Sequence, residues 1–268
     1  MSAVSQVARQ VGFTNKAFWR NPASAFFTFA FPLMFLVIFT SLLGSGDIER
    51  NGVTLNLSTY YVMAEAAFGV IAACYTNIAI GVSFQRDQGI LKRTRGTPLP
   101  GWSYLAARVI HSMIIAFILV AITVAFGIVF YSADVPTGVP LLQFILTLIV
   151  GGLSFAALAL ALTAVIPNAD ASPAVVNASI LPLLFLSGIF IPLGDDAPEW
   201  IKAVSNIFPV RHFFDAMADG FLGNLTVSTP TGVMRAYPFD WSDVVIVAVW
   251  GLAGLILAAR FFTWEPRK

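Results

Sequence analysis

Few side chains of this 268-residue chain could do acid–base or nucleophilic chemistry. Ser45 lies between two glycines, a weak form of the turn that carries a serine nucleophile, and the nearest base in the sequence is His111. The hydropathy pattern described below puts these two residues at opposite membrane faces, whereas a Ser–His pair needs hydrogen-bond distance. An intramembrane enzyme is therefore the least favoured alternative, and we expect no catalytic residue.

Cofactor and metal sites are not expected either. No Gly-Lys pair occurs, so the chain has no phosphate-binding P-loop, and it has no HExxH zinc motif. The one cysteine, Cys74, allows neither an internal disulfide nor a multi-cysteine metal site. We expect no metal and no cofactor in this chain.

The densest group of charges is the stretch FQRDQGILKRTRGTPLP, residues 84–100, which lies between two long apolar runs. Its four cations are Arg86, Lys92, Arg93 and Arg95. Such a loop is typical of a cytosolic connection between membrane spans. The alternative is that the loop is a surface on which another protein acts.

One acidic residue, Glu65, lies inside an apolar run. A carboxylate in the hydrocarbon is costly and predicts a functional role by default. It would lie on a substrate path or at a subunit interface. The alternative places it near the headgroups with no such role.

Composition makes this an integral membrane protein. The chain is 58% hydrophobic and 11% charged, with a mean hydropathy of +0.82, whereas a soluble domain has about 25% charged residues. A helix needs about 20 apolar residues to cross the hydrocarbon. We predict an all-α fold and one membrane domain over residues 1–268, with six spans at about 23–43, 60–83, 104–131, 141–166, 173–193 and 243–263.

The basic residues orient these spans. With a cytosolic N-terminus, the inner loops and ends carry eleven Lys and Arg and the outer loops carry four. Cytosolic loops are enriched in Lys and Arg. We therefore expect both termini, including Arg267 and Lys268, in the cytosol.

Two segments outside the spans have helical apolar spacing. Residues 4–20 alternate apolar and basic side chains, which favours a helix in the membrane interface over a plain basic flank. Residues 186–221 carry aromatic residues at helical spacing, interrupted by prolines. We predict two short re-entrant helices in the outer leaflet there, and the alternative is an interfacial aromatic belt.

Two motifs resemble one family. The run 85–93, QRDQGILKR, followed by TPLP at 97–100, and the run LSGIFIP at 186–192, followed by PEW at 198–200 and Pro209, are similar to those of permease subunits of ABC-2-type exporters of drugs and polysaccharides. The resemblance covers nearly the whole chain. One departure is Asp87, where the family commonly has Glu.

The resemblance implies a dimer of permease subunits, homomeric or heteromeric, and two copies of a separate P-loop ATPase that binds Mg-ATP. The loop after the second span would be a short coupling helix that binds the ATPase. Its implied contact residues are Arg86, Asp87, Gly89, Ile90, Leu91, Lys92, Arg93 and Arg95. Gly89 would permit a tight turn there.

The resemblance also implies a cargo path, because the first, second and fifth spans of the family face the dimer axis. The path candidates are Phe27, Phe35, Tyr61, Glu65, Phe68 and Asn177. The outer-gate candidates are Trp200, Phe208, Phe213 and Phe214. Aromatic walls suit an amphipathic cargo.

The expected function is ATP-driven export of an amphipathic small molecule or antibiotic across the bacterial cytoplasmic membrane. The expected partners are the ATPase, a second permease subunit, membrane lipid and cargo, with no nucleic acid. Export of a glycan or glycolipid is an alternative, and so is a membrane anchor or assembly protein that transports nothing.

Overall fold

The structure is a computed structural model that describes residues 3–43, 46–50, 53–97, 99–133, 135–193, 197–228 and 234–266. Ser45, Pro98, Arg267 and Lys268 lie outside the described residues, so the expectations that rest on them are untested. Within the described chain, five apolar helices are long enough to cross a membrane. They are α2 (Pro22–Leu43), the continuous helix Leu57–Asp87, α6 (Gly101–Tyr131), α7 (Val139–Leu162) and α11 (Trp241–Phe261). Five of the six predicted spans are confirmed as long apolar helices.

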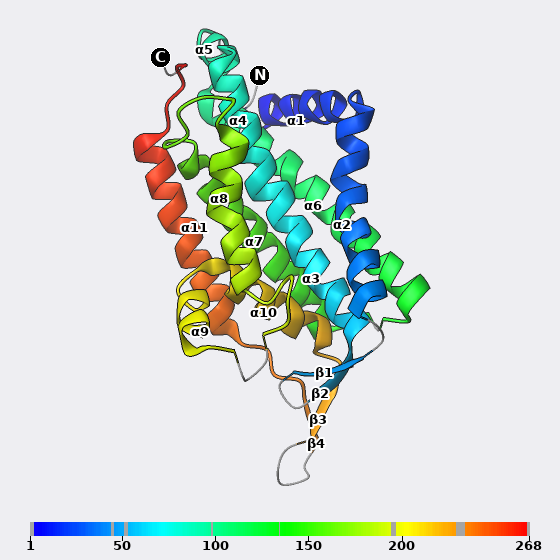
Figure 1. Cartoon of the computed structure of the whole chain (residues 1–268). Coiled ribbons are helices and arrows are strands. Elements are labelled where there is room, and N and C mark those ends of the chain that lie inside the picture. Colours follow the sequence, from blue (N-terminus) through cyan, green and yellow to red (C-terminus); the bar gives the residue numbers. More distant parts are fainter. Residues whose placement is uncertain are drawn as a thin grey trace.

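The continuous helix lies near the middle of the bundle (Figure 1). It consists of α3 (Leu57–Ile71), the π-helical segment η1 (Ala72–Thr76) and α4 (Asn77–Asp87). It contacts α2, α6, α7, α8 and α10. Short π-helical segments inside α-helices are frequent at functional sites.

The helix predicted over 173–193 is shorter than expected. The helix α8 (Ser172–Leu186) has 15 residues, so the prediction of its end was wrong by seven residues. Gly188 has a φ of +90°, a conformation that L side chains rarely adopt, and it turns the chain out of the helix. Whether α8 crosses the bilayer stays a prediction.

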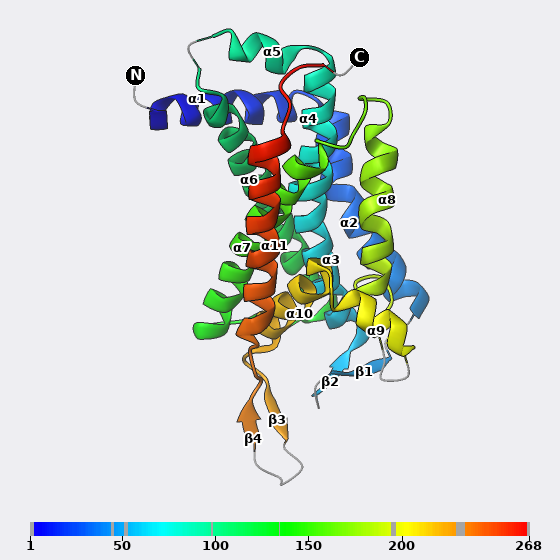
Figure 2. The same cartoon turned by 90° about the vertical axis from the view of Figure 1, so that its left-hand side faces the viewer.

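Helices are present at the positions where the N-terminal helix and the coupling helix were expected, and the coupling role stays a prediction. Helix α1 (Ala3–Trp19) lies across one end of the bundle, and α5 (Ile90–Arg95) projects from the same end (Figures 1 and 2). The two helices expected near the other end are α9 (Glu199–Ser205) and α10 (Pro209–Leu222). Their positions relative to a lipid bilayer stay predictions.

Two small antiparallel hairpins, which the all-α expectation missed, lie at the end opposite α1 (Figure 1). Strand β1 (Asp47–Arg50) pairs with β2 (Val53–Asn56), and β3 (Thr226–Ser228) pairs with β4 (Met234–Ala236). In the registers, Asp47 is opposite Asn56 and Thr226 is opposite Ala236. They connect α2 to α3 and α10 to α11.

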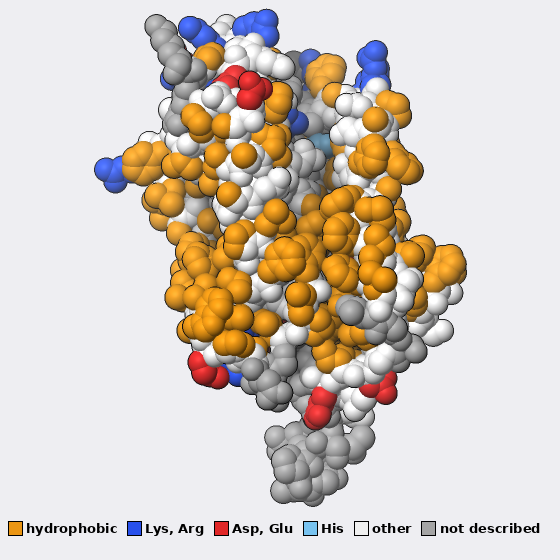
Figure 3. Space-filling view, viewed as in Figure 1, with side chains coloured by type: hydrophobic (Ala, Val, Ile, Leu, Met, Phe, Trp, Pro, Cys, Tyr) orange, Lys and Arg blue, Asp and Glu red, His pale blue; other side chains and the backbone are white. Residues whose placement is uncertain are grey.

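The surface is divided by side-chain type. Figure 3 shows a broad hydrophobic band across the visible face of the bundle, with most of the basic side chains in view at the end that carries α1 and α5. The opposite end shows several acidic side chains. This division suits a membrane protein whose basic end faces the cytosol.

Small residues bring some helices into close contact. A Cβ on Gly251 of α11 would lie 2.3 Å from Ser154 Oγ, and one on Gly254 would lie 2.8 Å from the backbone nitrogen of Leu158. Helix α10 packs as closely on α7, because a Cβ on Gly151 would overlap the Phe213 ring. Helices α7, α10 and α11 therefore form one tightly packed unit, whereas most of α2 is exposed.

Candidate functional site

The connection between α4 and α5 forms a tight turn. Helix α4 ends at Asp87, and Gly89 has a φ of +69° just before α5 begins. The Gly89 N–H donates to the Arg86 carbonyl over 3.0 Å, and the Arg93 N–H donates to the Gly89 carbonyl over 3.0 Å. The expected tight turn at Gly89 is confirmed. The turn leads into α5, which lies crosswise over this end of the bundle, above α1 in Figure 2.

Arg86 does not lie on the exposed surface, although it was a candidate contact for the ATPase. Its side chain is 1% exposed and is directed into the bundle. The guanidinium donates through Nη1 to the Thr163 carbonyl and through Nη2 to the Ile166 carbonyl, both over 2.8 Å. These carbonyls follow the end of α7, so Arg86 joins α4 to the α7–α8 connection.

Asp87 completes this arrangement. One of its carboxylate oxygens, Oδ1, lies 3.3 Å from Arg86 Nε, and the other, Oδ2, accepts from the Ala169 N–H over 2.5 Å. We name Arg86, Asp87 and the three backbone groups that they bind the α4 clasp. Each of the three guanidinium nitrogens of Arg86 thus has an acceptor, and such partners offset part of the cost of burying the charge.

The remaining candidates on this connection divide into two groups. Leu91 is fully buried within the chain, and Ile90 is half-buried. Lys92, Arg93 and Arg95 are exposed, and Arg93 makes one long hydrogen bond to the Gln88 carbonyl. The surface available to a partner is therefore the three exposed cations, which we name the α5 face.

The opposite end of the long helix is held by two tyrosines. The Tyr60 hydroxyl donates to the Gly188 carbonyl, and the Tyr61 hydroxyl donates to the Phe190 carbonyl over 3.4 Å. Both acceptors lie in the turn that follows α8. The helix α3–η1–α4 therefore connects the α4 clasp at one end with this turn at the other.

Aromatic rings gather beside these tyrosines. The Phe190 ring lies 5.9 Å from Phe35 and 5.4 Å from Phe68, and Phe39 stacks on Tyr61 with centroids 5.1 Å apart. Three path candidates, Phe35, Tyr61 and Phe68, thus come together. Sequence reasoning missed Phe39 and Phe190, although Phe39 is one helical turn after Phe35.

Two path candidates lie apart from this cluster. Phe27 is 64% exposed on α2 and contacts only Phe26 among the ring contacts of the described residues. Asn177 is exposed on α8. Their positions support a contact with lipid or another subunit rather than a shared site with Phe68.

Glu65 is fully buried in α3, one turn after Tyr61. Neither carboxylate oxygen has a hydrogen-bond partner among the described residues. A buried polar group without a partner is costly, so such a group in a native structure calls for a ligand, water or a second conformation. Its place beside the aromatic cluster keeps it a path candidate.

The four outer-gate candidates differ in how far they are buried. Phe213 and Phe214 are buried in the core, where Phe213 packs on Phe155 and Phe214 on Tyr60. Trp200 is 63% exposed on α9. Phe208 stacks on Trp250 of α11 at 5.9 Å. Of these four candidates, only Trp200 and Phe208 are exposed or half-buried within the chain.

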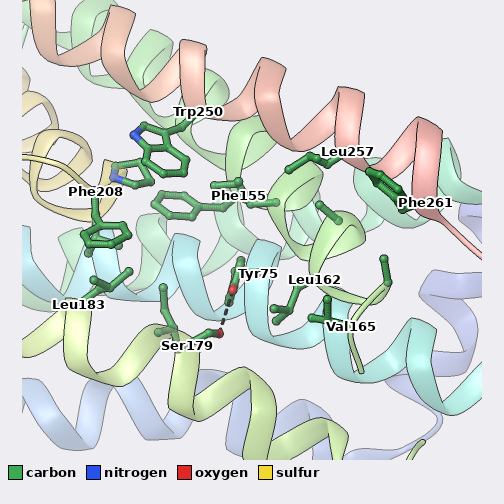
Figure 4. A pocket seen from close by; sticks show the side chains of 16 residues that line it. Tyr75, Phe155, Leu162, Val165, Ser179, Leu183, Phe208, Trp250, Leu257 and Phe261 are labelled. Carbon is green, nitrogen blue, oxygen red and sulfur yellow. Dashed lines mark hydrogen bonds between the residues drawn. The ribbon is translucent and has the colours of Figure 1, made fainter. Parts of the chain in front are cut away.

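An apolar cavity of about 600 Å³ opens beside Phe208, between α7, α8, α10 and α11. Figure 4 shows Phe155, Phe208 and Trp250 at one end and Leu257 and Phe261 toward the other. Its polar contribution is a hydrogen bond of 2.9 Å between the Tyr75 hydroxyl and Ser179 Oγ. The cavity suits an apolar chain or ring system.

The comparison with known families decides the identity of this fold. The ABC-2 type transporter family matches residues 6–222. The chain belongs to the ABC-2 type transporter family. The match covers α1, the α4 clasp, α5 and α10, so every site described above lies within it, apart from the α11 side of the apolar cavity.

Individual relatives are distant. "Probable multidrug ABC transporter permease YbhR" of Escherichia coli (strain K12) is 24% identical over 215 residues, which cover 80% of this chain and 56% of the relative. A protein of Cyanophora paradoxa named as a transport permease, ycf38, is 27% identical over 68% of this chain and 62% of its own length. A protein of Bacillus subtilis (strain 168) named as a transport permease, YvfS, is 21% identical over 72% of this chain and 76% of its own length. The chain thus spans little more than half the length of YbhR.

Proposed function

We propose that this chain is the membrane subunit of an ATP-driven exporter that moves an amphipathic small molecule out across the bacterial cytoplasmic membrane. Both termini lie in the cytosol in this proposal. The observation that carries it is the long helix α3–η1–α4, which joins an exposed basic surface at one end to an aromatic cluster at the other. The relative YbhR carries the name "Probable multidrug ABC transporter permease", which supports this class of cargo.

The energy source lies on a separate ATPase subunit, of which two copies serve a dimer of permease subunits. The sequence has no P-loop, so ATP must bind elsewhere. The α5 face offers Lys92, Arg93 and Arg95 to acidic groups of that ATPase. Exposed complementary charges mainly steer association and set specificity.

In this proposal the α4 clasp connects α5 mechanically to the rest of the bundle. Because Arg86 and Asp87 bind the α7–α8 connection, a force on α5 moves α4 and the start of α8 together. At the far end the tyrosine hydrogen bonds pass that motion to the turn after α8. ATP biases this motion only if the ATPase binds the two conformations with different affinity.

The proposed class of cargo rests on the residues that line the aromatic cluster and the apolar cavity. The aromatic cluster and the apolar cavity offer large apolar surfaces with few polar groups. A glycan would need many hydrogen-bond partners, which these walls lack, so an amphipathic molecule fits better. Glu65 beside the cluster is the polar contact for that molecule.

The test is co-purification of the chain with its ATPase in mild detergent, followed by an ATPase assay in nanodiscs. The double variant Lys92→Glu/Arg93→Glu should lose the ATPase from the complex. A matched control is Arg9→Glu/Arg20→Glu, which makes the same change in charge at two exposed positions, one in α1 and one directly after it. The control should keep the ATPase.

Two outcomes would contradict the proposal. Normal ATPase retention in the Lys92→Glu/Arg93→Glu variant would remove the α5 face from the interface. Purification with no ATPase in several mild detergents would favour the membrane anchor or assembly protein. Export itself is tested by measuring how much of each cargo accumulates in cells with the unchanged chain and in cells with the Glu65→Gln variant. The variant should export a different set of cargo molecules.

A further inference from the structure

A second cavity, of about 370 Å³, lies at the end of the bundle that carries α1. It is lined by residues of α1, α4, α5 and α6. The α4 residues that line it run from Asn77 to Gln85, eight residues apart, so the cavity extends about 12 Å along that helix. This depth corresponds to a molecule that enters from the headgroup region rather than one that rests on the surface.

The polar lining is basic and rich in donors. Arg108 on α6 hydrogen-bonds with Tyr104, and the Tyr104 hydroxyl donates to Gln85 Oε1 on α4. Among the described residues, no carboxylate lies within ion-pair distance of Arg108, and the lining contains no Asp or Glu. A charge at this depth without a counter-ion calls for one.

His111 gives independent support. It lies one turn after Arg108, lines the same cavity and is 4% exposed. Its Nδ1 atom has no hydrogen-bond partner within the described part of the chain. Asn77 is exposed although it lies within a membrane span, and it too lines the cavity. Buried polar groups normally have partners, so this set is incomplete without a ligand.

The remaining wall is apolar and belongs to α1. Phe13, Ala17 and Phe18 line the cavity, and the Phe18 ring packs on the His111 ring with centroids 5.5 Å apart. Helix α1 has apolar and basic faces, as helices at a membrane interface do. A ligand here would meet positive charge at its head and aromatic carbon beside it.

We propose that this cavity binds the phosphate headgroup of an anionic phospholipid from the cytosolic leaflet. Arg108, with Asn77 and His111 beside it, holds the phosphate, and Phe13 and Phe18 contact the glycerol and upper acyl carbons. Guanidinium–phosphate contacts are charge-assisted hydrogen bonds, which are stronger than neutral ones. The bound lipid fastens α1 to α4 and α6. The choice of the cytosolic leaflet rests on the proposed orientation of the chain, whereas the binding of an anionic lipid depends on neither the cargo nor the ATPase.

The experiment compares lipids directly. The purified chain is placed in nanodiscs of phosphatidylcholine alone or of phosphatidylcholine mixed with phosphatidylglycerol, and its Tm is measured in each. Phosphatidylglycerol retained after detergent extraction is counted by native mass spectrometry. We expect a higher Tm with phosphatidylglycerol, because the lining has no acidic group to receive a choline cation.

The variants locate the site. Arg108→Gln should weaken phosphatidylglycerol retention by about tenfold, as the loss of one charged hydrogen bond predicts. Asn77→Leu, at an exposed side chain that can change without disturbing the core, should weaken it by several-fold. The control Arg20→Gln removes an exposed cation from the end of α1, outside the cavity lining, and should retain the lipid as the unchanged chain does.

Three results would overturn the inference. The first is an equal Tm in the two lipid mixtures. The second is unchanged retention in both Arg108→Gln and Asn77→Leu. The third is an equal rise in Tm when inorganic phosphate alone is added in detergent, which would assign the site to free phosphate.

Discussion

Two sets of cations lie within ten residues of each other and have opposite surroundings. Arg86 is 1% exposed and donates to two backbone carbonyls of the α7–α8 connection. Lys92, Arg93 and Arg95 are exposed, and among the described residues the carboxylate ion pair of this stretch is that of Arg86 with Asp87. A count of Lys and Arg in the loops, which predicts the orientation of the spans, would treat both sets alike.

This difference in burial indicates that the residues of the family motif 85–93 have two roles. The α4 clasp holds the end of the long helix in place, whereas the α5 face is free to bind a partner. Removing a clasp residue should therefore cost stability. Removing an α5-face residue should cost only association, and the following predictions test that division in order of the size of their effect.

Arg86→Ala should have the largest effect on stability. It removes the guanidinium that donates to the Thr163 and Ile166 carbonyls and that pairs with Asp87. We expect a loss of about 3 kcal/mol in the free energy of unfolding. Unfolding by titration with SDS measures it. A change as small as that of Arg93→Ala would show that the clasp does not hold the bundle.

Asp87→Asn should have a smaller effect. The amide oxygen still accepts from the Ala169 N–H, but the charge that pairs with Arg86 is lost. We expect a loss of about 1–2 kcal/mol in the same assay. Asp87→Glu, which keeps the charge on a longer stem, is the control and should fall between Asp87→Asn and the unchanged chain.

Gly89→Ala tests the turn between the two regions. A Cβ there meets no atom within 4 Å, so the cost comes from the φ of +69° alone. We expect a loss of about 1 kcal/mol. Asn tolerates this backbone region better, so Gly89→Asn should cost less. Equal stability of the Ala and Asn variants would mean that the turn relaxes.

Lys92→Ala/Arg93→Ala should have the smallest effect on stability, within about 0.5 kcal/mol, as for other exposed positions. The same double variant should weaken ATPase binding, and the binding of the unchanged chain should weaken as salt is raised from low to physiological concentration. Salt-independent binding of the ATPase would place its contact on apolar groups and not on the α5 face.

The apolar runs predicted much of the fold. Five long helices lie where twenty-residue apolar stretches predicted them, and the helices α1, α9 and α10 lie where apolar spacing indicated helices. These signals are local, because each helix satisfies its own backbone. The end of α8 was missed because the turn at Gly188 is fixed by a distant contact from Tyr60.

The sites were less predictable for the same reason. Nothing near Arg86 in the sequence shows that it binds carbonyls 77 and 80 residues later. Phe213 and Phe214 have the spacing of a surface aromatic belt, yet Gly151 opens room for Phe213 inside the bundle. The cavity beside Arg108 and His111 depends on where α1 crosses α6, which no single segment encodes.

The π-helical segment Ala72–Thr76 has one further consequence. A π turn holds one residue more than the α turn that it replaces, and each residue of an α-helix turns it by about 100°. The relative direction of Glu65 and Arg86 around the helix axis thus depends on one inserted residue. Deleting a single residue there would leave both halves helical and equally apolar, yet would rotate one functional face away from its partner. In this helix the number of residues, and not only their types, determines which side chains face the same neighbours.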